Sequence, residues 1–175
     1  MIYDVSIVPL PMQAVVDLKG DATGITSRLQ RLGLSEPEPG HATTFGPVQV
    51  VRVGREHWLL RGPLEDEQRL LSTLQEGASP VDTLVLAVSD AYAFFGVAGP
   101  HARQIMAIAS PLDTDTRAFP ADGATFTEAF GQKALVLRNG SGFELAFERS
   151  YACMASDYFS RINGGPDGPA GGGNH

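Results

Sequence analysis

The sequence predicts an α+β fold made of two small subdomains, each with strands and helices in the order β-α-β-β-α-β. Two observations support this prediction. Apolar runs with strand and helix periodicity follow one another in that order in the first half, and a similar series begins again after residue 89. The length of 175 residues suits one domain or two small subdomains that share a core.

The chain divides into four segments, which are an N-terminal arm (1–12), a first subdomain (13–89), a second subdomain (90–162) and a tail (163–175). Pro9 and Pro11 favour extended structure in the arm, because proline disfavours the interior of a helix. The tail has six glycines and two prolines in thirteen positions. A flexible tail is expected, since almost none of its residues can bury apolar area.

The first subdomain begins with an apolar strand at residues 14–19. A helix follows, and its apolar face is marked at helical spacing by Ile25, Leu29 and Leu32. Gly33 is the expected C-terminal cap of this helix. Residues 35–47 contain three prolines and two glycines, which predict a loop.

A β-hairpin and a second helix come next. Strand-like runs at 48–53 and 57–61 flank a short glycine-containing turn, which is typical of a hairpin with a bulge. The helix begins after Pro63 with an acidic first turn, and its apolar face is marked by Leu64, Leu70, Leu71 and Leu74. The continuous apolar run at 83–88 predicts a strand that is covered on both faces. This order is the split βαβ arrangement of ferredoxin-like folds.

The second subdomain begins in similar style. A strand at 93–98 leads into a helix that opens with proline, and three strands follow at about 125–130, 133–138 and 143–148. In the last strand, apolar residues alternate with Glu144 and Glu148, which predicts one exposed face. Ser150 is the expected N-cap of a final helix. The inward residues expected on that helix are Tyr151, Met154, Ala155, Tyr158 and Ile162.

Composition excludes several classes of protein. Thirteen basic and twenty acidic residues give a net charge of −7, so nucleic-acid binding is not expected. No apolar run approaches the ~20 residues of a membrane span, and the N-terminus does not resemble a signal peptide. Cys153 is the single cysteine, which excludes an intrachain disulfide and a Cys-Cys zinc pair. A cytoplasmic location is therefore expected.

The sequence contains no self-sufficient catalytic constellation. The four histidines form no metal-binding motif, and no glycine-rich phosphate loop follows a strand. Cys153 has no neighbouring histidine to activate it as a nucleophile. Trp58 could stack against a ring-shaped ligand, although a place in the core is the commoner use of tryptophan. Neither catalytic, cofactor-binding nor metal-binding residues are predicted.

Six short motifs follow one another along the chain, and they are RLGL (31–34), GREHWLL (54–60), VSD (88–90), GPHAR (99–103), SPLD (110–113) and ERSYA (148–152). This set of motifs resembles the gamma subunit family of heterotetrameric sarcosine oxidase. Their order and spacing resemble that family over about residues 10–162. The same layout is more distantly similar to the folate-binding fold of glycine-cleavage aminomethyltransferase. Motif residues that could bear on the function are Trp58, Asp90, Gly99, Arg103 and Asp113.

This resemblance implies a role in an enzyme complex. In the family, the alpha and beta subunits hold NAD, FAD and covalently bound FMN, and alpha, beta, gamma and delta subunits assemble together. The complex oxidises sarcosine with oxygen and tetrahydrofolate, and it produces glycine, hydrogen peroxide and methylene-tetrahydrofolate. The resemblance implies that this chain binds none of these cofactors and has a structural role.

Two hypotheses of different classes follow. The first is a non-catalytic assembly subunit, and the second is a stand-alone folate-binding or one-carbon-transfer protein. Asp90 is interpreted either as a turn residue at a strand end or as a carboxylate at a ligand pocket. Residues 7–12 and the loop at Phe119 are candidate interfaces, because their apolar residues lie outside the expected strands and helices. Each could instead pack against its own core.

Overall fold

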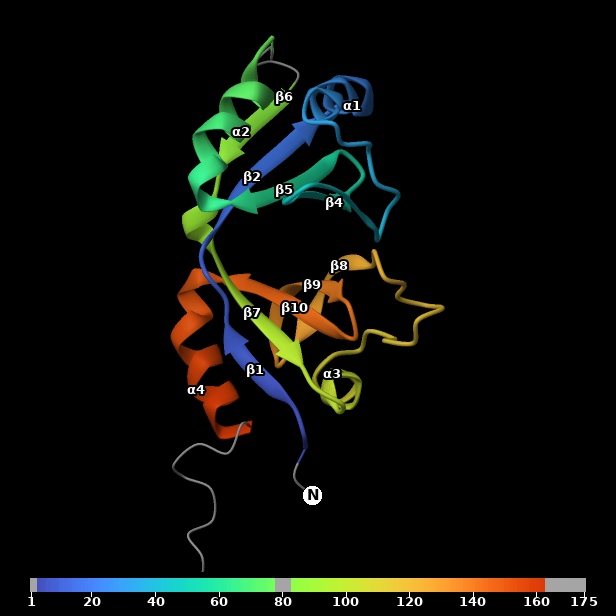
Figure 1. Ribbon diagram of the computed structural model, residues 1–175, viewed down its shortest axis with the longest axis vertical. Helices are drawn as coiled ribbons and strands as arrows, with labels where there is room; N and C mark the ends of the chain where they lie inside the picture. The colour runs from blue at the N-terminus through green and yellow to red at the C-terminus, as the bar shows by residue number, and fades with distance from the viewer. Residues whose placement is uncertain (1–2, 78–82, 163–175) are drawn as a thin grey trace, which may run out of the picture.

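The fold was analysed in a computed structural model that describes residues 3–77 and 83–162 (Figure 1). The predicted flexible tail at 163–175 lies outside these residues. The described chain forms two five-stranded sheets, and every neighbouring pair of strands is antiparallel. The predicted α+β class is confirmed.

The first sheet has the strand order β3-β4-β5-β2-β6. Its elements are β2 (Gln13–Gly20), α1 (Ala22–Arg31), β3 (Ala42–Phe45), β4 (Val48–Gly54), β5 (His57–Pro63), the 3₁₀ turn η1 (Leu64–Asp66), α2 (Glu67–Gln75) and β6 (Thr83–Ala87). Strands β4, β5, β2 and β6 have the ferredoxin-like order. Strand β3 corrects the predicted loop at 35–47, because the threonine-rich segment after the prolines pairs with β4.

The second sheet has the order β1-β7-β10-β9-β8. Its elements are β1 (Ser6–Pro9), η2 (Ser89–Ala91), β7 (Tyr92–Ala98), α3 (Ala102–Ala109), β8 (Ala124–Ala129), β9 (Gln132–Asn139), β10 (Gly142–Glu148), η3 (Arg149–Tyr151) and α4 (Ala152–Ile162). The N-terminal arm therefore supplies an edge strand to the second half. A Cβ at Gly99 would lie 2.7 Å from the carbonyl oxygen of Asp4, so glycine permits this close approach.

The two halves repeat one arrangement. In sheet order, β6, β2, β5, β4 and β3 correspond to β1, β7, β10, β9 and β8. Strand β5 begins at residue 57 and β10 at 142, η1 at 64 and η3 at 149, and α2 at 67 and α4 at 152. Each second element therefore begins 85 residues after the first. The buried residues of the helices follow the same offset, since Leu70 and Leu74 correspond to Ala155 and Phe159.

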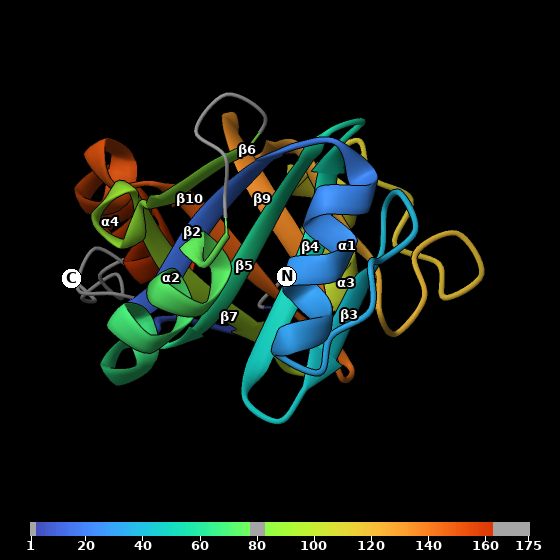
Figure 2. The ribbon, with the colours of Figure 1, turned by 90° about the horizontal axis from the view of Figure 1, so that it is seen from above.

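The sheets lie face to face between two helical layers. Helices α1 and α2 lie across one sheet (Figure 2), and α3 and α4 lie on the outer face of the other (Figure 1). The inter-sheet core contains Val15, Ala42, Val51, Leu59, Phe94, Ala124, Leu135, Leu137 and Ala146. Because both halves contribute to this core, the boundary at residue 89 stays a prediction. Among the described residues, no helix has the length and apolar composition needed to cross a membrane.

Burial corrects the expected exposure of two strands. Strand β6 was expected to be covered on both faces, but it lies at a sheet edge, and Leu84 and Leu86 are about half exposed. Strand β10 was expected to have one exposed face, but six of its seven residues are buried, including Glu144. Its central place in a sheet packed on both faces accounts for this.

Helix α4 turns inward only part of the face that was predicted, since Ala155 and Ile162 pack against the core as expected. Ala155 and Phe159 are buried, whereas Tyr151, Met154 and Tyr158 are 39%, 46% and 52% exposed. The apolar stripe of this helix is therefore wider than the surface that the second sheet covers. Ser150 lies inside η3 and does not directly precede α4, because a 3₁₀ turn leads into the helix.

Candidate functional site

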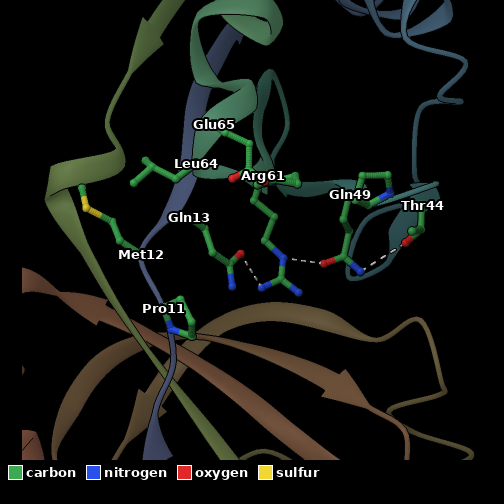
Figure 3. A pocket seen from close by; sticks show the side chains of 11 residues that line it. Pro11, Met12, Gln13, Thr44, Gln49, Arg61, Leu64 and Glu65 are labelled. Carbon is green, nitrogen blue, oxygen red and sulfur yellow. Dashed lines mark hydrogen bonds between the residues drawn. The ribbon is translucent and has the colours of Figure 1, made fainter.

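A groove of about 400 Å³ lies beside the junction of the two sheets (Figure 3). Its rim includes Met12, from the link between β1 and β2, and Leu64, from η1. Both side chains are about 40% exposed. Its polar lining includes Gln13, Gln49 and Arg61, which come from β2, β4 and β5. Neighbouring strands of one sheet thus bring three hydrogen-bonding side chains together.

Beneath the groove, Arg61 forms a bidentate ion pair with Glu144 of β10 in the opposite sheet. The Arg61 Nε donates to Gln49 Oε1 at 2.7 Å, and its Nη1 donates to Gln13 Oε1 at 3.2 Å. Gln13 Nε2 donates to Glu144 Oε1 at 3.0 Å. These four residues form the inter-sheet network.

The inter-sheet network is suited to a structural role. The side chains of Arg61 and Glu144 are 15% and 6% exposed, so each charge depends on the other for compensation. Glu144 accepts hydrogen bonds from both Arg61 and Gln13, which leaves it poorly suited to act as a free general base. The space between the sheets is also well filled, and a void lined by Tyr92 and Phe94 measures about 10 Å³. The network joins the two halves.

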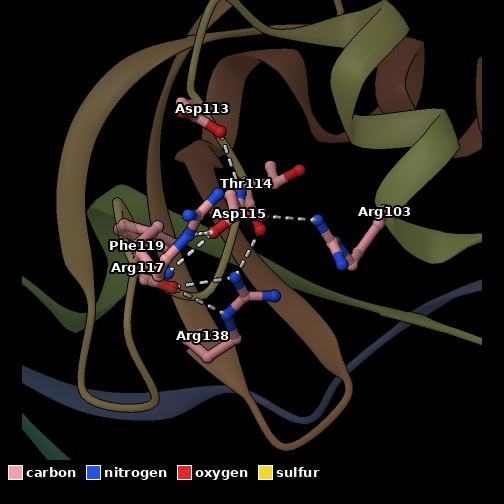
Figure 4. Close-up of polar contacts among 7 residues, drawn as sticks. All are labelled: Arg103, Asp113, Thr114, Asp115, Arg117, Phe119 and Arg138. Carbon is pink, nitrogen blue, oxygen red and sulfur yellow. Dashed lines mark hydrogen bonds and ion pairs between the residues drawn. The ribbon is translucent and has the colours of Figure 1, made fainter.

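A second polar cluster surrounds Arg138 of β9 (Figure 4). Arg138 is 8% exposed, and its Nη2 donates to the carbonyl oxygens of Thr114 and Phe119 at 2.7 and 2.8 Å. The guanidinium carbon lies 5.5 Å from the ring centre of Phe119 and 4.5 Å from that of Phe143. Arg138 thereby holds the long loop between α3 and β8 against the second sheet.

Three residues singled out in the sequence belong to this cluster. Arg103 lies 3.7 Å from Asp115, Asp113 accepts a hydrogen bond of 2.9 Å from the Asp115 backbone N–H, and Phe119 lies against Arg138. Hydrogen bonds from the backbone N–H and then the side chain of Arg117 lower the pKa of Asp115, and Arg103 and Arg138 add to this. Burial, followed by the nearby charge of Arg103, lowers the pKa of Arg138. These contacts order the loop.

The other three singled-out residues lie elsewhere. Trp58 is fully buried beneath α1 and α2, and Arg52 lies 5.5 Å from its ring centre. Asp90 is exposed in η2, and its carbonyl oxygen accepts a hydrogen bond of 2.8 Å from Arg149 Nε. Gly99 lies at the contact with the N-terminal arm. The six residues therefore do not form one site.

Of the two alternatives for residues 7–12 and the loop at Phe119, packing against their own core holds for Ile7 and Phe119. Ile7 is 2% exposed within β1, and Phe119 is 4% exposed. Both belong to the core between the second sheet and its helices. Pairing of the arm with β7, and packing of the Phe119 ring against Phe143, account for this burial. Met12, in contrast, is exposed at the groove rim.

Sequence reasoning missed Arg61 and Glu144. Both occur in strands where a lone charged residue is usually assigned to the solvent face. A signal for Arg61 was its place directly after Trp58, Leu59 and Leu60 in an otherwise apolar run. Recognising the pair required knowledge that β5 and β10 face each other across two sheets.

Histidine–carboxylate pairs occur at two places. His57 Nε2 lies 2.5 Å from Asp17 Oδ1, and His41 Nδ1 lies 3.1 Å from Asp122 Oδ2. No group of three or more histidine, cysteine, aspartate or glutamate residues within 3–77 and 83–162 could hold a metal ion. Neither pair therefore has the ligand number of a metal centre.

Comparisons with known proteins identify the fold. No family model matches the sequence, and no curated protein matches it. A chain of the heterotetrameric sarcosine oxidase from Corynebacterium sp. U-96 is similar in structure, with a TM-score of 0.81 and 19% identity. The match covers 97% of this chain and 88% of that chain.

Glycine cleavage system aminomethyltransferase T from Bartonella henselae has a TM-score of 0.65 and 13% identity. This match covers 91% of the present chain and 46% of the enzyme chain. At these identities, the two similarities establish the shared fold.

Proposed function

We propose that this chain is a non-catalytic gamma-type subunit of a sarcosine-oxidase-like heterotetrameric flavoenzyme. The observation that carries the proposal is the nearly end-to-end match with a chain of the Corynebacterium sarcosine oxidase, over 97% of one chain and 88% of the other. The aminomethyltransferase match is less extensive on the side of the relative, since 46% of the enzyme chain is covered.

The polar chemistry of the chain supports this assignment. Its buried charged side chains are held by other groups of the chain, since Glu144 pairs with Arg61 and Arg138 donates to backbone carbonyl groups. Such groups stabilise a fold and leave little capacity for proton transfer. In the proposed complex, alpha and beta subunits carry FAD, FMN and NAD and use tetrahydrofolate, while this chain binds none of them. The alpha, beta and delta subunits are its proposed partners in the cytoplasm.

A second candidate function is folate binding by the chain alone. The groove favours it, because about 400 Å³ is within the range of small-molecule sites and Gln13, Gln49 and Arg61 line it. Against it stands Glu144, whose carboxylate already accepts hydrogen bonds from Arg61 and Gln13. A pterin ring would have to displace these contacts to use this carboxylate.

Co-expression with the flavin-bearing subunits from the same organism tests both candidates. The assembly proposal predicts stoichiometric co-elution in gel filtration and a complex that releases hydrogen peroxide from sarcosine. The purified chain alone should be colourless and should not bind tetrahydrofolate in calorimetry. Retention of flavin by the isolated chain would contradict the proposal, while folate binding by the isolated chain would favour the second candidate.

A further inference from the structure

The outer face of α4, together with the end of η3, carries three half-exposed apolar side chains. Tyr151, Met154 and Tyr158 are 39%, 46% and 52% exposed and recur at helical spacing. The Tyr158 ring lies 5.7 Å from that of Phe130, which extends the apolar surface toward the turn between β8 and β9. We call Tyr151, Met154 and Tyr158 the α4 face.

The first half of the molecule contains a natural control for this surface. At the offset of 85 residues, the α4 face corresponds to Asp66, Arg69 and Thr73 of η1 and α2. Asp66 and Arg69 form an ion pair of 3.0 Å, and the Thr73 hydroxyl donates to the Arg69 carbonyl at 2.8 Å. The same positions are thus polar on η1 and α2 and apolar on η3 and α4, although both sets of side chains are at least partly exposed on the surface.

We infer that the α4 face is the docking surface for a larger, different protein, namely a flavin-bearing subunit of the proposed complex. This inference rests on the proposed function. Tyrosine and methionine are enriched in the cores of protein interfaces, where tyrosine combines apolar area with a hydroxyl group. The partner should therefore present an apolar hollow with hydrogen-bond acceptors near its edge for the two phenols.

Charge disfavours a second copy of this chain as the occupant. A tyrosine buries about 150–250 Å² when fully covered, so three half-exposed side chains offer roughly 300 Å². A standard interface buries about 800 Å² on each partner, so the α4 face would form one part of the contact with any occupant. Each copy also carries a net charge of −7, so two copies repel each other.

The test replaces the α4 face with the residues of its counterpart, through Tyr151→Asp, Met154→Arg and Tyr158→Thr in one chain. Phe45→Ser is the control, because Phe45 is 61% exposed and lies on β3 in the other half. Cys153 is exposed and is the single cysteine, so a thiol-reactive fluorophore can be attached there. Neighbouring helix positions point in different directions, which keeps the label off the α4 face.

Fluorescence anisotropy with the purified flavin-bearing subunits then measures the affinity. We expect the triple variant to bind at least ten-fold more weakly, with an unchanged melting temperature, and Phe45→Ser to bind within two-fold of wild type. Should the triple variant fold poorly, Met154→Arg alone is expected to weaken binding at least three-fold.

The possible failures are distinguishable. Equal binding by wild type and the triple variant overturns the docking surface and leaves the proposed function intact. If wild type does not bind these subunits, the proposed function fails and the docking inference fails with it. Sedimentation showing a wild-type dimer that the triple variant disrupts would identify a second copy as the occupant, which also overturns the inference.

Discussion

The two halves of the molecule close the space beneath their helices in different ways. In the first half, Arg28 and Arg31 of α1 donate hydrogen bonds to carbonyl oxygens at the end of α2, including those of Leu74 and Glu76 at 3.0 and 2.6 Å. In the second half, rings of Phe95, Phe130 and Phe147 lie 4.9 to 6.1 Å from Phe159 of α4. The same arrangement of strands and helices is therefore stabilised by hydrogen bonds between helices in the first half and by aromatic packing beneath a helix in the second half.

The largest expected effect comes from removing the centre of the aromatic packing. Phe159→Ala should lower the free energy of unfolding by about 3–5 kcal/mol, at the upper end of this range because three rings lose a neighbour. Urea denaturation of this variant and of Leu74→Ala, at the equivalent position of α2, provides the comparison. A smaller loss for Phe159→Ala than for Leu74→Ala would contradict the idea that aromatic packing dominates the second half.

The inter-sheet network tests whether the halves depend on each other. Glu144→Ala should cost about 3–5 kcal/mol, because it leaves the buried charge of Arg61 without its partner. The double variant Arg61→Met with Glu144→Leu should recover most of this loss, since apolar replacements of a buried pair are often neutral. Equilibrium unfolding of the three proteins measures both. A double variant as unstable as Glu144→Ala would show that the network is needed for more than charge compensation.

The hydrogen bonds of Arg28 between α1 and α2 should contribute less to the free energy of unfolding than the aromatic packing or the inter-sheet network. Arg28 is 6% exposed and donates to the carbonyl oxygens of Gly24, Leu74 and Gly77. Arg28→Ala should cost about 1–3 kcal/mol, because buried carbonyl groups lose their donors. Arg28→Lys should recover little, since an ammonium group cannot span three acceptors as the guanidinium does. Amide hydrogen exchange at the end of α2 would locate the loss, and unchanged exchange there would exclude the assigned role.

The comparison of the halves also shows what sequence can predict. From residue 57 to 75, the residue 85 positions later is identical once, at Leu60 and Leu145. What the two segments share is the placement of buried apolar residues, such as Trp58 with Phe143 and Leu74 with Phe159. Periodicity depends on that placement, so it predicted most strands and helices of both halves, although it missed the short edge strands β1 and β3.

Exposure was harder to predict, because it depends on which surfaces meet. Glu144 was predicted to be exposed but is buried, because β10 lies in the middle of its sheet. Leu86 was predicted to be buried but is half exposed, because β6 lies at a sheet edge. The same limit applies to the inter-sheet network, whose two charged residues are 83 positions apart in sequence. Local patterns identify elements, whereas pairing across sheets requires the assembled fold.

The smallest expected effect concerns the ion pair between Asp66 and Arg69 on the polar counterpart of the α4 face. The hydrogen bond from Arg69 lowers the pKa of Asp66 in the folded protein. Burial opposes this less strongly, and the charge of Arg69 adds a smaller lowering of the pKa. A carboxyl group whose pKa falls on folding adds stability at pH values above its unfolded pKa of about 3.9. That stability is lost as the pH falls through the lower, folded pKa.

Asp66→Asn should therefore destabilise the chain slightly at pH 7, and less than the three preceding substitutions, because the pair is largely exposed and screened by salt. The difference from wild type should disappear in strong acid and shrink in 1 M salt. Thermal unfolding at pH 7 and at pH values below 3.9 measures this, with Tyr151→Phe at the equivalent position of η3 as the pH-insensitive control. If the difference persisted unchanged in acid, the effect of Asp66 would come from packing or helix capping. The ion pair would then not explain any difference in stability between α2 and α4.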